Sequence, residues 1–163
     1  MWSIQGERAA RHEFSLRGGN YSVLPALSMD GILHLDVLEN AITSDNFRSF
    51  VRGLLNHMNK WPLPNSVLVI DDASIHKAAR IRELVEECGA RLLYLPPYSP
   101  DFNPVELAFP TIKEWLDANS DHIDREFESE SGTAYDVLRE AVHAITAEQT
   151  KGWFKNCGYL PDE

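Results

Sequence analysis

Two acidic residues directly follow a strongly apolar segment, and chemistry is most plausible at this point of the sequence. Residues 66–70 form a continuous apolar run that is typical of a strand buried on both faces, and Asp71 and Asp72 come next. Binding sites in open α/β sheets form at the carboxyl ends of strands. Because side chains alternate along a strand, we expect only one of the two carboxylates to line a site. Asp72 could instead cap the helix that follows.

A third acidic residue, Glu106, lies 35 residues beyond Asp71 in the first turn of another expected helix. Asn103 precedes it by three residues, which matches a capping box and makes Glu106 a candidate cap partner. Alternatively, Glu106 points back toward Asp71, and the two carboxylates hold Mg²⁺ or Mn²⁺, which take oxygen ligands. His76 could support such a site by contacting a phosphate or orienting a ligand, although polar residues are common in a first helical turn.

The elements that must position these residues follow from hydrophobic periodicity and turn signals. A strand, a helix and a strand in succession predict a parallel βαβ unit around Asp71. Cys88 is expected to face inward on its helix, and Cys157 is also expected to be buried. The expected elements are a hairpin over 21–28 and 32–38, a helix starting at 43–45, a strand over 66–70, a helix ending at Gly89, a strand over 91–95, a proline-rich loop over 96–104 and a helix beginning at Asn103–Pro104.

Composition and charge limit the classes of function. The chain has 163 residues, 44% of them hydrophobic and 25% charged, which predicts one globular domain without a membrane span. Its net charge is -10, so the basic footprint of a typical nucleic-acid-binding domain is absent. The acidic excess is concentrated after residue 117, and a polyanion would have to contact the first part of the chain. We expect a core over 1–116, a mobile acidic linker over 117–132 and a closing helix within 133–159.

Residues 67–76 and 93–109 together resemble the catalytic domain of mariner-type DDE transposases, particularly members from fungal genomes. The proline loop ending in Asn-Pro-x-Glu carries most of this resemblance, and the segments 21–31 and 152–159 extend it over nearly the whole chain. The resemblance implies an α/β, RNase H-like mixed sheet with flanking helices and a site for Mg²⁺ or Mn²⁺. It assigns Asp71 and Glu106 as the second and third catalytic and metal-binding acids. Asp72, His76 and Asn103 are candidate supporting residues of the same site.

The sequence also departs from the family pattern. The strand that carries the first catalytic Asp would precede Met1, so we expect a partial domain that lacks the usual first strand. Asp72 stands where the family usually has Asn. Pro110 falls inside a helix, where it cannot donate to the carbonyl of Glu106 and costs about 3 kcal/mol.

The resemblance implies metal-dependent cutting and joining of DNA at transposon ends in the nucleus. We expect this chain alone to be inactive as an enzyme because one acid of the triad is missing. It could still associate with itself or with a full-length transposase. The alternative is a non-catalytic RNase H-like scaffold that binds a protein partner. A phosphorelay receiver domain is rejected, because there the Asp pair ends the first strand, whereas here about 70 residues precede it.

Overall fold

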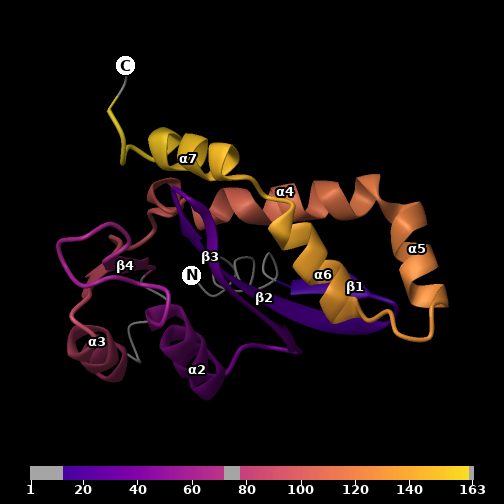
Figure 1. Cartoon of the computed structure of the whole chain (residues 1–163), viewed down its shortest axis with the longest axis horizontal. Coiled ribbons are helices and arrows are strands. Elements are labelled where there is room, and N and C mark those ends of the chain that lie inside the picture. Colours follow the sequence, from indigo (N-terminus) through magenta and orange to yellow (C-terminus); the bar gives the residue numbers. More distant parts are fainter. Residues whose placement is uncertain (1–12, 72–77, 162–163) are drawn as a thin grey trace.

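A computed structural model describes residues 13–71 and 78–161 of the chain. Helices lie on both sides of the strands (Figure 1), as expected for an α/β fold. The elements are β1 (Glu13–Leu16), β2 (Gly19–Ser28), β3 (Gly31–Glu39), α2 (Ser44–Leu55), β4 (Val67–Ile70), α3 (Ala78–Glu87), β5 (Arg91–Tyr94), the 3₁₀ turn η2 (Pro100–Phe102), α4 (Val105–Ala118), α5 (Ser120–Glu128), α6 (Ala134–His143) and α7 (Ala147–Asn156).

The expected hairpin is confirmed as β2 and β3, which pair antiparallel around the turn at Asp30. The short strand β1 adds to the outer side of β2 and was not predicted. Arg17 and Gly18 connect β1 to β2, and both have positive φ, which is the backbone of a tight type I′ hairpin turn.

The expected βαβ unit is also confirmed, since β4 and β5 are parallel and paired from Val67–Arg91 to Ile70–Tyr94. The strands form two sheets, an antiparallel one in the order β1-β2-β3 and a parallel one in the order β4-β5. Within the described part of the chain, no strand joins the two sheets into the single mixed sheet that the resemblance implies.

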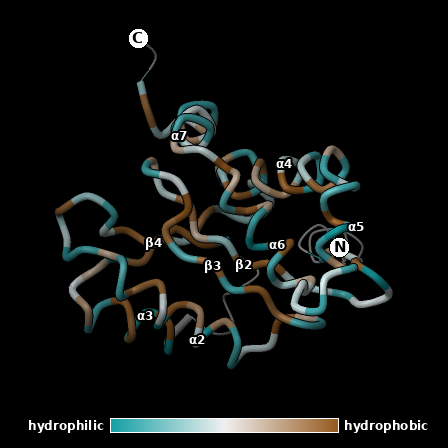
Figure 2. The backbone as a smooth tube through the Cα atoms, turned by 45° about the vertical axis from the view of Figure 1, so that its right-hand side comes forward, coloured by the Kyte–Doolittle hydropathy of each residue, from teal (hydrophilic) through white to brown (hydrophobic). Residues whose placement is uncertain are grey.

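Two hydrophobic clusters hold these layers together. One packs α4 and α6 against the antiparallel sheet, and it contains Val23, Ile112 and Leu138. The other packs α2 and α3 against β5, and it contains Leu54, Ile81 and Leu92. Figure 2 shows hydrophobic segments running through the middle of the molecule, where the strands lie between the helices.

The prediction that β4 is buried on both faces is wrong. Leu68 and Leu92 face the cluster under α2 and α3, whereas Val67 is 38% exposed and Leu93 is 52% exposed. Alternation explains the difference: the apolar run has two faces, and α2 and α3 cover only one of them. Cys88, expected inside, is also exposed.

Most of the acidic segment over 117–132, which was predicted to be a linker, is helical. Its residues complete α4 and form α5, where Ile123 is buried although the segment is acidic. The predicted closing helix is two helices, because Thr146 caps α7 in a capping box with Gln149. That Thr-x-x-Gln pattern is visible in the sequence and could have located the break.

Candidate active site

Asp71 stands at the carboxyl end of β4, where the parallel ladder fixes the backbone. The Leu95 amide donates to the Ile70 carbonyl at 2.9 Å, which extends the pairing of the two strands to the residue before Asp71. The Asp71 side chain is half-buried. Its predicted neighbours Asp72 and His76 lie outside the described residues.

The loop after β5 turns the chain back toward α4 through short local hydrogen bonds. The Phe102 amide donates to the Ser99 carbonyl at 3.2 Å, and the Asn103 amide donates to the Pro100 carbonyl at 3.0 Å. These bonds form the 3₁₀ turn η2, whose residues are not buried. Tyr98 at the start of the loop has φ of 56°, in the left-handed region. The prolines at 96, 97, 100 and 104 further restrict the loop backbone.

The predicted capping box between Asn103 and Glu106 does not form. Helix α4 begins one residue later than expected, with Pro104 as the N-cap. The Asn103 side-chain oxygen accepts from the Val105 backbone amide at 3.3 Å. The Asn103 backbone amide donates to the Pro100 carbonyl. The physical reason is η2, which ends directly before Asn103. In a capping box the Asn103 backbone amide would donate to the Glu106 side chain, but here it already donates to the Pro100 carbonyl of η2.

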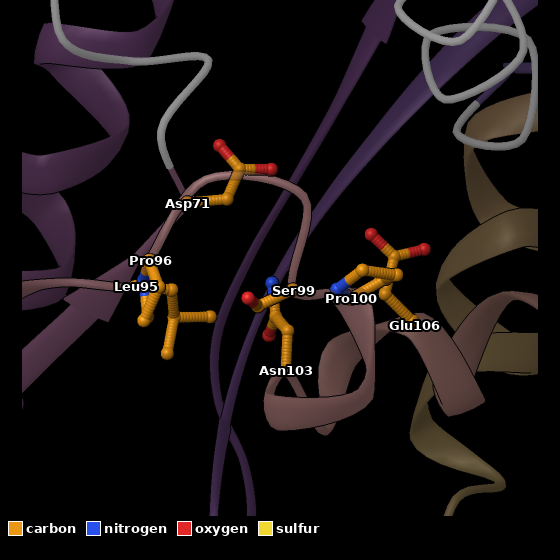
Figure 3. A pocket seen from close by; sticks show the side chains of 7 residues that line it. All are labelled: Asp71, Leu95, Pro96, Ser99, Pro100, Asn103 and Glu106. Atoms are coloured by element: carbon orange, nitrogen blue, oxygen red, sulfur yellow. The ribbon is translucent and has the colours of Figure 1, made fainter.

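Asp71 and Glu106 both line one shallow pocket, so the fold brings these two residues together. The other lining residues come from the β5 end and the proline loop: Leu95, Pro96, Ser99, Pro100 and Asn103. In Figure 3 the two carboxylates stand on different walls and point to the same side of the pocket. One oxygen of Glu106, Oε2, is buried.

The donor chemistry of this pocket suits a hard divalent cation. Two carboxylates from separate elements are what Mg²⁺ commonly takes from a protein, the remaining positions being filled by water and substrate phosphates. The Asn103 side-chain oxygen already accepts from a backbone amide, so Asn103 shapes the loop beside the carboxylates. No group of three or more His, Cys, Asp or Glu residues with metal-binding geometry occurs within residues 13–71 and 78–161.

The proline loop also contributes wall residues that residue-level reasoning did not single out. Ser99 lines the pocket and donates its hydroxyl to the Pro97 carbonyl at 3.2 Å. Leu95 is buried beneath the loop. The signal for both was their place at the carboxyl end of the predicted strand over 91–95 and in the loop that follows it, at the sheet edge where sites form.

Comparison with known proteins identifies the family. Residues 1–127 match the family described as DDE superfamily endonuclease. The chain belongs to this family. No curated protein matches the chain significantly.

Two solved structures share the fold of this DDE domain. One is the Mos1 transposase catalytic domain with raltegravir and magnesium, at 15% identity and a TM-score of 0.53, with 98% of this chain and 90% of that chain covered. The other is the Mos1 mariner paired end complex with manganese, at 14% identity and a TM-score of 0.51, with 91% of this chain covered. The DDE chain spans about half of the Mos1 chain in that complex, 47% of its length.

The family match confirms a DDE endonuclease domain, and the two solved structures confirm the predicted α/β, RNase H-like fold class. None of the helices in the described part of the chain has the length and apolar character that a membrane span requires.

Proposed function

We propose that this DDE domain supplies two carboxylate ligands, Asp71 and Glu106, to a divalent-metal centre for phosphoryl transfer on DNA. The observation that supports the proposal is their convergence in one pocket from the end of β4 and the first turn of α4. Mg²⁺ or Mn²⁺ bound there would supply activation of the attacking water or 3′-hydroxyl and stabilisation of the leaving oxygen. The chain itself holds the two carboxylates on separate elements, the end of β4 and the first turn of α4, so that both line the same pocket.

The same proposal includes the expectation that the chain does not cleave DNA by itself. Two-metal centres in this family use three acids, and the described residues bring only Asp71 and Glu106 into the pocket. The DNA partner would be a transposon end, and the site would act in the nucleus, alone or together with a second copy or a full-length transposase. The acidic excess after residue 117 favours DNA approach from the side of the first part of the chain.

Metal binding is the direct test. Titration of the whole chain with Mn²⁺, followed by electron paramagnetic resonance of the free ion, should show saturable binding that Asp71→Asn and Glu106→Gln each weaken at least tenfold. Asp101→Asn is the matched control, because Asp101 is an exposed carboxylate on the same loop that does not line the pocket. Equal binding by the wild type and both site variants would refute the proposed centre.

Cleavage is tested separately on supercoiled plasmid with Mg²⁺ or Mn²⁺. We expect no nicking by the chain alone. A metal-dependent nick that Asp71→Asn abolishes would show that the chain is a complete nuclease and would overturn the inactivity part of the proposal.

A non-catalytic scaffold is the second candidate, and the outer face of β4 and β5 favours it. Val67 and Leu93 are exposed there, and large apolar side chains exposed together on a sheet often mark a protein contact. If the chain binds a full-length transposase, and Asp71→Asn leaves that binding intact while Leu93→Glu abolishes it, the scaffold is the better description.

A further inference from the structure

The end of α7 lies against the loop that leads to Glu106, although the two are more than 50 residues apart in sequence. The Tyr159 hydroxyl donates to the Phe102 carbonyl at 2.6 Å. A second observation agrees, since the negative charge of Asp101 on the same loop contributes, after burial, to raising the pKa of the Cys157 thiol. In Figure 1 the carboxyl-terminal end of α7 lies beside the turn before α4.

A C-terminal capping motif at the end of α7 fixes the position of Tyr159. The Tyr159 amide donates to the Phe154 carbonyl and the Gly158 amide donates to the Lys155 carbonyl, both at 3.0 Å. This pair of bonds is a Schellman motif, with Gly158 at the left-handed position with φ of +88°. The motif usually brings together the side chains at its two ends, and here the rings of Phe154 and Tyr159 meet edge to face at 5.7 Å.

The loop needs an external contact because its other supports are weak. Its backbone bonds at Phe102 and Asn103 reach back only three residues. The side chains of Tyr98 and Phe102 are 62% and 49% exposed, so they do not anchor the loop in a core. The bond from Tyr159 therefore connects this loop to a helix that is packed elsewhere, since Trp153 of α7 joins the cluster under α4 and α6.

We propose that Tyr159 is a positioning residue, whose hydroxyl orders the loop 98–103 and thereby fixes the start of α4, where Glu106 faces the pocket. The value of this order for metal binding rests on the proposed function above. The ordering of the loop does not depend on the proposed function, because it concerns only the bond between Tyr159 and Phe102 and the mobility of the loop.

The test is amide hydrogen exchange of the whole chain, followed by NMR at Phe102, Asn103 and Glu106. Tyr159→Phe removes the hydroxyl and keeps the ring contact with Phe154. We expect exchange at the three amides to become about two- to fivefold faster, the equivalent of about 0.5–1 kcal/mol for one hydrogen bond. Amides in the middle of α4 and α6 should keep their rates.

Two further variants sharpen the result. Tyr98→Phe is the matched control, because it removes a hydroxyl from the same loop at a highly exposed position and should change nothing. Gly158→Ala should accelerate the loop amides as Tyr159→Phe does, since alanine strains the left-handed turn while its methyl group meets no atom within 4 Å.

The outcomes separate this inference from the proposed function. Unchanged loop exchange in Tyr159→Phe, or acceleration spread evenly over α4 and α6, overturns the positioning role. Saturating Mg²⁺ should slow the loop amides in the wild type and not in Asp71→Asn. If the loop accelerates in Tyr159→Phe but Mg²⁺ has no effect on the wild type, the positioning role stands and the metal centre fails.

Discussion

Replacing Pro110 by alanine should stabilise the domain, and the position of this proline in α4 explains why. The helix runs from Val105 to Ala118 without a break, so Pro110 is in its interior. It has no amide hydrogen to donate to the carbonyl of Glu106, four residues earlier. The helix persists because Ala108 and Ile112 on its inner face are fully buried against the sheet and α6.

The size of the effect follows from the exposure of Pro110. Its ring faces solvent, so alanine leaves no cavity, and the change is dominated by helix propensity. Proline is about 3 kcal/mol less favourable than alanine in a helix interior. We expect most of this, about 2–3 kcal/mol, to appear as a higher free energy of unfolding. For a chain of this size, this corresponds to a rise in Tm of about 5–10 °C.

Urea unfolding followed by circular dichroism measures this difference. Gly152→Ala calibrates the assay, because Gly152 lies in α7 with no atom within 4 Å of an added Cβ, and alanine there should give the ordinary gain of about 1 kcal/mol. If Gly152→Ala stabilises the domain while Pro110→Ala leaves it unchanged or weaker, the propensity argument for α4 is refuted. That result would mean that the proline geometry is itself part of how α4 packs.

Two further predictions concern the segments beside the sheet. Gly132→Ala should lower the free energy of unfolding by about 1–3 kcal/mol, because its Cβ would clash with the Glu126 carbonyl oxygen and the turn would lose hydrogen bonds. If this segment were a mobile linker, urea unfolding would show no such loss. Burial lowers the pKa of His34 below 6.5 despite the nearby charge of Asp36, so this group's contribution to stability is present above pH 6.5 and is lost as the pH falls through the lowered pKa. The free energy of unfolding, measured from about pH 7.5 to about pH 5, should therefore fall less steeply in His34→Gln than in the wild type. Identical pH profiles of the two proteins would contradict this.

The parts of the fold that the sequence predicted are those with local signals. The Asp30-Gly31 turn located the hairpin, and α2 begins within the expected range 43–45, with Thr43 as its N-cap. The apolar run before Asp71 and the proline loop before Glu106 located the two walls of the pocket. In each case residues within a few positions of one another decide the structure, so the pattern can be interpreted without knowing the tertiary contacts.

The errors arose where distant contacts decide. Acidic composition suggested a linker after α4, but burial of Ile123 gives the segment enough tertiary support to form α5. The capping box at Glu106 was a sound local pattern, and it failed because the preceding 3₁₀ turn uses the Asn103 amide. The contact of Tyr159 with Phe102 joins segments 57 residues apart, which periodicity does not report.

The two carboxylates are held by different kinds of structure, and this bears on how the site would fail. Asp71 follows a parallel ladder whose hydrogen bonds continue to Leu95. Glu106 follows a loop with short-range bonds and exposed side chains, which one hydroxyl ties to α7. Local opening begins where buried apolar contacts are few. The Glu106 wall should therefore open before the Asp71 wall, and the distance between the carboxylates depends on the end of α7 as much as on the sheet.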